Sequence, residues 1–280
     1  MKISIFAVCH NSYQESFKFL ESIDKSLKNN EIDLDLFFID NSTLESNKDI
    51  NSIKKLQFNY KIHYFRSDNL GYFPSIASVI IKNNILVDNY DYTCISNVDL
   101  RLSKSFFQNM LNIQKQNKVG VYAPSIISLE LNVNKNPKIS KRPSRLKLQV
   151  NKLFFKFFLS HILLKFVNSL RLTLKESISR KKNSLVEKNF LKEIYAAHGS
   201  FLIFTKTYIQ NENSFSYPIF LFGEEIYVAE IAKKHGLKIM YCPSLIIYDD
   251  EHASTSLISS KGYRKFNREA LTYLLSKYDF

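Results

Sequence analysis

The sequence predicts an α/β fold in which helices cover a doubly wound, mostly parallel β-sheet. Short apolar runs alternate with helical patterns four or five times within about the first 120 residues. Several of these runs end on polar or acidic side chains, as strands of an open α/β sheet do where a ligand binds. Of the 280 residues, 45% are hydrophobic and only 6 are Gly and 6 Pro, which excludes disordered and fibrous classes.

In the first half of the chain, the polar residues after each strand are the candidate site residues. Asp40 ends the second strand, and Gly71 permits a tight turn before the next helix. Asn97 and Asp99 end the fourth strand, so that their oxygens can face one ion or diphosphate. The alternative is that these acids only cap the helices that follow. Strands are expected over 3–9, 34–39, 61–65, 92–99 and 119–123, and helices over 13–27, 74–87 and 103–116.

A basic segment, residues 138–192, interrupts this alternation. It contains 15 Lys or Arg and two acids, whereas the rest of the chain carries 24 charges of each sign. Its residues 146–174 mix Phe and Leu with cations, which favours a helix or helical hairpin lying on an anionic membrane surface. The alternative is a helical pair packed on its own domain. Nucleic-acid binding is disfavoured, because the cations lie among aliphatic residues rather than on a Gly-rich aromatic sheet.

The alternation resumes after the basic segment. His198 and Gly199 precede an apolar run at 201–204, and Glu224 and Glu225 open a helix that Gly236 closes. Acids in the first turn are ordinary helix residues, so a structural role is the alternative to a chemical one. Strands at 237–242 and 245–248 should lead to His252, followed by a helix over 261–277.

Cysteine usage and the apolar runs predict a cytoplasmic protein. Cys9, Cys94 and Cys242 are far apart, odd in number and embedded in apolar runs, which favours buried thiols in a reducing compartment. The first apolar run is too short for a signal peptide, and no run reaches the roughly 18 residues of a spanning helix. Any membrane association should therefore be peripheral, on the inner face of the cytoplasmic membrane.

Taken in order, these motifs resemble those of family-two glycosyltransferases with the GT-A fold. The closest resemblance is to the bacterial rhamnosyltransferase-like branch, which makes surface polysaccharides. It covers roughly residues 1–130 and 195–256, and it implies one GT-A domain over 1–280 with the segment 138–192 inserted. The motifs are Asn11, Asp40-Asn41-Ser42, Asn69-Leu70-Gly71-Tyr72, Asn97-Val98-Asp99, His198-Gly199, Phe222-Gly223-Glu224-Glu225 and His252.

The resemblance implies a site for a nucleotide sugar and a divalent metal ion, Mg²⁺ or Mn²⁺. Asp99 matches the second acid of the family's Asp-x-Asp motif, which holds the ion on the donor diphosphate. His252 matches the histidine that completes this site in some members. The first acid is replaced by Asn97 in this chain. The nucleotide-sugar site would be bordered by His10, Asn11, Asp40, Asn69, Gly71 and Asn97.

The resemblance also implies an acceptor site. Glu224-Glu225 matches a Glu-Asp pair whose second acid is the general base, so Glu225 would be the catalytic residue. Its side chain is one methylene longer than the Asp that is usual at this position. Glu224, His198 and Gly199 would bind the acceptor. The implied activity is inverting transfer from a UDP-, dTDP- or GDP-linked sugar to a glycan or lipid-linked acceptor. The products would be O-antigen, capsule or lipooligosaccharide, and nucleic acid would not be a partner.

Two other functions are compatible with the same fold class. A nucleotidyltransferase would favour a Gly-rich, basic phosphate loop near the amino terminus, and residues 7–13 contain no such loop. A non-catalytic scaffold that binds a membrane surface or a nucleotide would use the basic segment and need no general base. Binding of nucleoside diphosphates with a divalent ion separates an enzyme of this type from a scaffold.

Overall fold

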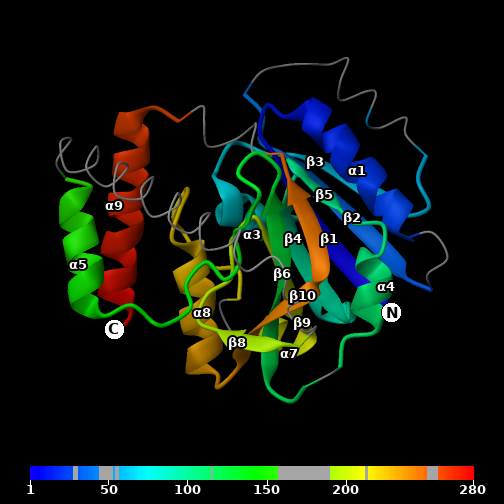
Figure 1. Cartoon of the computed structure of the whole chain (residues 1–280). Helices are drawn as coiled ribbons and strands as arrows, with labels where there is room; N and C mark the ends of the chain where they lie inside the picture. The colour runs from blue at the N-terminus through cyan, green and yellow to red at the C-terminus, as the bar shows by residue number, and fades with distance from the viewer. Residues whose placement is uncertain are drawn as a thin grey trace.

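A computed structural model describes residues 1–27, 31–43, 53, 57–114, 116–156, 190–211, 214–250 and 258–280. A 10-stranded sheet forms the centre, with helices on both faces (Figure 1). The main path of the sheet has the strand order β3-β2-β1-β4-β9-β6-β10-β5. This mixed α/β architecture confirms the predicted fold class.

The first half of the sheet follows the predicted β-then-α order. Its four strands are parallel to one another, because a helical or long connection returns the chain to the same edge each time. They are β1 (Lys2–Cys9), β2 (Asp33–Asp40), β3 (Lys61–Arg66) and β4 (Tyr92–Asn97). The connecting elements include α1 (Tyr13–Leu27), α3 (Tyr72–Lys82) and the 3-10 helix η1 (Val87–Asn89).

The second half of the sheet is mixed. β9 (Phe201–Thr205) lies antiparallel between β4 and β6 (Val119–Ser128), and β10 (Lys238–Asp249) runs parallel to β6. The strands predicted at 237–242 and 245–248 are therefore one strand, which passes Pro243 through a register shift between Cys242 and Ile246. The shorter strands are β5 (Leu100–Leu102), β7 (Val133–Asn134) and β8 (Lys192–Ile194).

Each face of the sheet carries its own hydrophobic core, because alternate residues of a strand point to opposite faces. Ile3 and Ile5 of β1 pack in the core that contains Phe19 of α1. Phe6, the residue after Ile5, packs in the other core with Ile76 of α3. The two cores fix the strand ends, and hence the polar residues that follow them.

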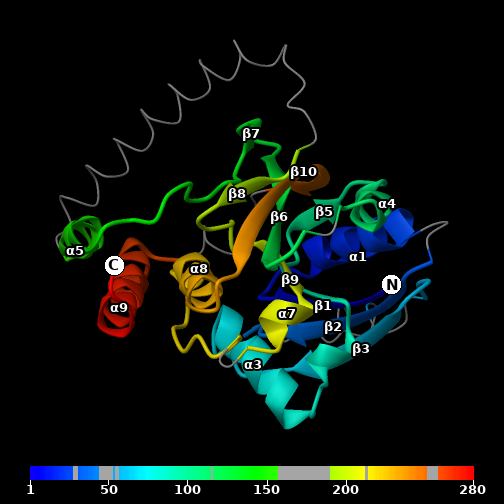
Figure 2. The same ribbon diagram turned by 90° about the horizontal axis from the view of Figure 1, so that it is seen from below.

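The remaining helices are shorter than or shifted from several predictions. The helix predicted over 74–87 is α3, which ends at Lys82, and the helix predicted over 103–116 is α4 (Phe106–Leu111). The others are α5 (Arg145–Phe154), α7 (Lys206–Ile209), α8 (Glu224–Lys234) and α9 (Ser260–Lys277). Helices α5 and α9 pack side by side, with α8 between them and the sheet (Figure 2).

The basic segment is described only at its two ends, because residues 157–189 lie outside the described ranges. Arg142 is already used inside the fold: its Nε and Nη2 donate to the two carboxylate oxygens of Glu230 at 2.8 and 2.7 Å. Arg142 lies before residues 146–174, for which the surface helix is predicted, and the structure describes that stretch only as far as residue 156. None of the described helices combines the length and apolar character that crossing a bilayer requires.

Candidate active site

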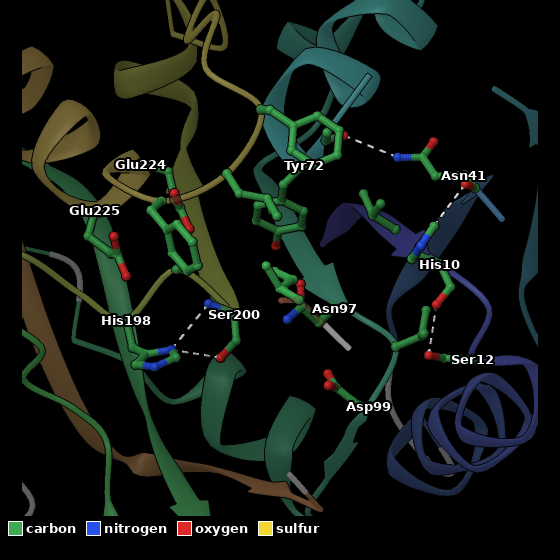
Figure 3. A pocket seen from close by; sticks show the side chains of 18 of the residues that line it. His10, Ser12, Asn41, Tyr72, Asn97, Asp99, His198, Ser200, Glu224 and Glu225 are labelled. Atoms are coloured by element: carbon green, nitrogen blue, oxygen red, sulfur yellow. Dashed lines mark hydrogen bonds between the residues drawn. The ribbon is translucent and has the colours of Figure 1, made fainter. Parts of the chain in front are cut away.

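A cavity of about 480 Å³ opens at the carboxyl ends of β1 and β4. Its volume is in the range of small-molecule sites in proteins. Glu224 and Glu225 lie on one side of it and His10 on the other, with Asn97 and Asp99 between them (Figure 3). The predicted site residues that line it are His10, Asn69, Gly71, Asn97, Asp99, His198, Gly199, Glu224 and Glu225.

The approach to α8 places the two glutamates in this cavity. Phe222 and Gly223 both have left-handed backbones, with φ of 69° and 84°, so the chain turns sharply before the helix begins. The Phe222 carbonyl accepts a hydrogen bond from Tyr217 Oη at 2.7 Å, which holds the turn. Glu224 and Glu225 therefore occupy the first turn of α8 at the cavity wall.

Gly71 lies against the loop before α8, at the wall of the cavity. Its φ is 101°, and a Cβ at this position would lie 2.2 Å from the carbonyl oxygen of Phe220. Tyr72 N donates to the same oxygen at 3.1 Å. A side chain at residue 71 would therefore separate α3 from the 220–222 loop, which explains the glycine.

Asp99 is the candidate metal ligand. Its Oδ1 is buried and has no hydrogen-bond partner among the described residues. Burial, and next the charge of Asp249, raise the pKa of Asp99 to about 6. Asp249 also lines the cavity, and its Oδ2 is 2.8 Å from Lys135 Nζ.

The oxygen atoms at and near Asp99 are suitable ligands for a hard divalent cation. A buried carboxylate oxygen without a partner and the neighbouring amide of Asn97 are oxygen ligands of the kind that Mg²⁺ and Mn²⁺ prefer. Within the described ranges, no group of three or more His, Cys, Asp or Glu side chains is arranged to hold a metal ion. His252 lies outside those ranges.

The adjacent glutamates have different surroundings. Glu224 packs under Gly199, where an added Cβ would lie 3.0 Å from its Oε1. Burial, and next the charge of Glu225, raise the pKa of Glu224 to about 8, so this carboxyl is mostly protonated at neutral pH. Glu225 Oε1 lies 4.0 Å from Lys138 Nζ. One acid can thus donate a hydrogen bond while the other stands beside a cation.

His198 is held in a neutral form beside the glutamates. Burial, and then the charges of Lys138 and Lys135, lower its pKa well below the usual range. Its Nδ1 is 2.9 Å from Ser200 Oγ, and its backbone N donates to Asn136 Oδ1 at 2.7 Å. The imidazole can therefore offer a neutral hydrogen-bonding edge to a ligand.

Asp40 does not line the cavity. Its Oδ2 accepts hydrogen bonds from Tyr13 Oη at 2.9 Å, Tyr64 Oη at 2.5 Å and Arg66 Nη1 at 2.7 Å, and the residue has no exposed surface. Burial alone would raise the pKa of Asp40, but hydrogen bonds from Ser42, Tyr64 and Arg66 lower it overall. Asp40 therefore lies beneath the cavity surface, and its contact with a nucleotide stays a prediction.

The next residue, Asn41, reaches the cavity instead. Its Nδ2 donates to Gly71 O at 3.1 Å and to Ser75 Oγ at 2.7 Å, while its Oδ1 is buried without a partner among the described residues. Its carbonyl is 3.0 Å from His10 Nδ1. Asn11, predicted to border the donor, is absent from the cavity lining and bonds through its side chain to Thr43.

Among the cavity residues that the sequence did not identify are Asn41, Lys135, Lys138 and Asp249. Asn41 lies inside the Asp-Asn-Ser motif and was overlooked in favour of its acidic neighbour. The Lys135-Asn136-Pro137-Lys138 turn follows the long strand β6 and its hairpin partner β7, so basic residues after a strand end were the available signal.

No family model matches the sequence, and no curated protein matches it. Solved structures do resemble the fold. A 1–349 piece of S. aureus TarS superposes with a TM-score of 0.53 at 10% identity, over 89% of this chain and 60% of that one. The structure of GalNAc-T7 with UDP, GalNAc and Mn²⁺ superposes with a TM-score of 0.55 at 11% identity, over 91% of this chain and 44% of that one.

A longer TarS structure gives a TM-score of 0.52 at 10% identity, covering 89% of this chain and 37% of that one. The chain thus spans well under two thirds of the length of these neighbours. All of them are GT-A glycosyltransferases, and the shared feature at such low identity is the arrangement of the sheet and its helices. The chain therefore has the GT-A glycosyltransferase fold.

Proposed function

We propose that this protein is an inverting glycosyltransferase of the rhamnosyltransferase-like kind. The donor would be a UDP-, dTDP- or GDP-linked sugar, and the acceptor a glycan or lipid-linked hydroxyl in surface polysaccharide synthesis. One observation carries the proposal: the acids at the start of α8 and the Asn97-Val98-Asp99 strand end line the same cavity. A general base and a diphosphate site must lie on either side of the sugar for direct transfer.

The reaction needs one proton acceptor and a stabilised leaving group. The acceptor oxygen forms a bond to the anomeric carbon as the bond from that carbon to the diphosphate oxygen breaks. Glu225 takes the hydroxyl proton, because an alcohol is too weak a nucleophile in its neutral form. Glu224, whose pKa is raised to about 8, donates a hydrogen bond and orients the acceptor together with His198.

The leaving diphosphate requires positive charge at the opposite side of the sugar. Asp99 would hold a divalent cation through its unpartnered oxygen, with His252 as a further ligand. When bound, such an ion neutralises charge that builds on the diphosphate. The GalNAc-T7 neighbour was solved with UDP and Mn²⁺, which supports looking for the same pair here.

Nucleotide binding tests the proposal directly. UDP, GDP or dTDP with Mn²⁺ is expected to raise the melting temperature by about 5 °C at a hundredfold excess over Kd, because a ligand that binds only the folded state stabilises it. The measurement is a thermal shift series with all three diphosphates and the matching triphosphates. No response to any of them would favour the scaffold alternative, and a response restricted to nucleoside triphosphates would favour the nucleotidyltransferase.

A second feature supports peripheral membrane association, which we propose as part of the same function. Leu146 and Leu153 on α5 are 70% and 57% exposed, and Val150 between them is also exposed. The three side chains share one helix face, since they are spaced by four and three residues. Leu148 on the other face is buried, and residues 131–175 contain no acid. An apolar stripe among cations fits an anionic bilayer.

Binding to lipid vesicles checks this part. The protein is expected to bind vesicles with anionic lipid and to be released by salt, because each cation near the surface contributes about 1 kcal/mol. A Leu146→Ser, Val150→Ser, Leu153→Ser triple variant should bind more weakly, and an exposed-leucine variant elsewhere, Leu86→Ser, should behave as wild type. Equal sedimentation with neutral and anionic vesicles would contradict the proposal.

A further inference from the structure

We infer that Lys135 and Lys138 hold the diphosphate of the donor, as a pair of fixed ammonium groups on the turn after β7. This inference rests on the proposed function, and no motif used above assigns it. Both residues line the cavity that also contains Asn97 and Asp99. They flank Asn136-Pro137, so one short turn supplies both cations.

The turn is anchored to the fold at its centre. Asn136 is buried; its Nδ2 donates to Pro124 O at 2.7 Å, and its Oδ1 accepts from His198 N at 2.7 Å. Next along the chain, Ile139 and Ala196 exchange two backbone hydrogen bonds, of 3.1 and 2.9 Å. The lysine backbones are therefore held on both sides, and both residues line the cavity.

The two ammonium groups face different parts of the site. Lys135 Nζ is 2.8 Å from Asp249 Oδ2, on the side of Asp99, while Lys138 Nζ is 4.0 Å from Glu225 Oε1. The charges of both lysines also lower the pKa of His198, in addition to the larger effect of its burial. The pair thus spans the cavity from the proposed metal ligand to the proposed base, where the diphosphate and the sugar must lie.

The charge of the cavity requires such a pair. Four acids line it, Asp99, Asp249, Glu224 and Glu225. Even with Glu224 protonated, the others carry negative charge when ionised, and a nucleoside diphosphate brings more. Among the described lining residues, the permanently charged cations are Lys135 and Lys138. Because Asn97 replaces one acid of the usual metal motif, one fewer anionic ligand would hold an ion there, and the diphosphate then depends more on the cations of the chain itself. Fixed lysines offset the repulsion that an anion would otherwise meet.

A purely structural role explains the geometry less well. A structural ion pair needs close contact, yet the Lys138–Glu225 separation is 4.0 Å and 45% of the Lys138 side chain is exposed. An exposed pair of this kind contributes little to stability. An ammonium group has three N–H donors, so Lys135 can keep its bond to Asp249 and still donate to a phosphate oxygen.

The test compares a diphosphate with its parent nucleoside. Calorimetry in excess chelator would measure binding of UDP, GDP and dTDP and of the matching nucleosides to wild type, Lys135→Gln and Lys138→Gln. Each variant is expected to bind the preferred diphosphate about 10- to 100-fold more weakly, the usual loss for a charged hydrogen bond, with nucleoside affinity unchanged. Lys141→Gln, which removes an exposed cation outside the cavity, should match wild type.

The outcomes separate the two proposals. Wild-type diphosphate affinity in both folded lysine variants overturns the inference and leaves the glycosyltransferase proposal standing. If the wild type binds no diphosphate in chelator, the same comparison is made with Mn²⁺. Absence of nucleotide binding in the wild type under both conditions overturns the proposed function and the inference with it. If Lys135→Gln fails to fold because Asp249 loses its partner, as a melting curve would reveal, Lys138→Gln decides alone. An equal loss of nucleoside and diphosphate affinity also counts against the lysines.

Discussion

Replacing Glu225 by glutamine is expected to lower the rate of sugar transfer by about 10²- to 10⁴-fold, the usual effect of losing a general base. Glutamine has nearly the same shape but cannot take the hydroxyl proton. Donor affinity should stay at the wild-type value, because the proposed donor contacts lie at Asn97, Asp99 and the lysines. Single-turnover transfer to a verified acceptor, with nucleotide affinity measured in parallel, checks both statements.

Glu224→Gln is the matched control for this prediction. Burial, and next the charge of Glu225, raise the pKa of Glu224 to about 8, which favours the protonated carboxyl that glutamine imitates. Its transfer rate at pH 7 should therefore fall much less than that of Glu225→Gln. Any loss should appear as weaker binding of the acceptor. If Glu225→Gln transfers sugar at the wild-type rate, or if Glu224→Gln alone is inactive, Glu225 is not the base.

Replacing Asp99 by asparagine is expected to weaken binding of nucleoside diphosphate with Mn²⁺ by about 10- to 100-fold, because a charged ligand to the cation is lost. In the wild type, this binding should fall as the pH drops through about 6, where the buried Asp99 takes up a proton. The variant should show no such step. Calorimetry between pH 5 and 8 measures both effects.

The stability of the Asp99→Asn variant gives an independent check. Folding raises the pKa of Asp99 from an ordinary 3.8 to about 6, so the folded chain binds more protons than the unfolded chain between these values. Wild-type stability should therefore decrease as pH rises through that window, and the variant should melt no lower than wild type at pH 7.5. Asp88→Asn, an exposed change in η1, is the control. Full activity in excess EDTA would contradict a metal role for Asp99.

The first half of the fold was predictable because each step is local. An apolar run, a polar turn and a helical pattern follow one another, and right-handed crossovers then make neighbouring strands parallel. The antiparallel insertion of β9 was not predictable in this way. An apolar run such as 201–204 has the same pattern in either direction, and its partners β4 and β6 lie about 80 to 110 residues earlier in the chain.

The same limit explains the site residues that were misplaced or missed. Asn97 at the end of β4 and Glu224 at the start of α8 line the cavity because of where these two elements end and begin. Asp40 ends a strand too, but Arg66 and Tyr64, more than twenty residues away, hold it beneath the surface. Lys138 was grouped with the basic segment because composition averages over a stretch, whereas its role depends on one turn.

The contact between Arg142 and Glu230 also fixes the distance between α8 and the start of α5. Glu230 is five residues beyond Glu225 on α8, about 7.5 Å along the helix axis. Arg142 donates hydrogen bonds to both carboxylate oxygens of Glu230, and it lies three residues before α5. If α5 rests on a bilayer, the proposed base therefore stands at a constant height above the headgroups. An acceptor tethered to lipid would be glycosylated only when its spacer is long enough to reach that height, so the enzyme would select acceptors by length as well as by chemistry.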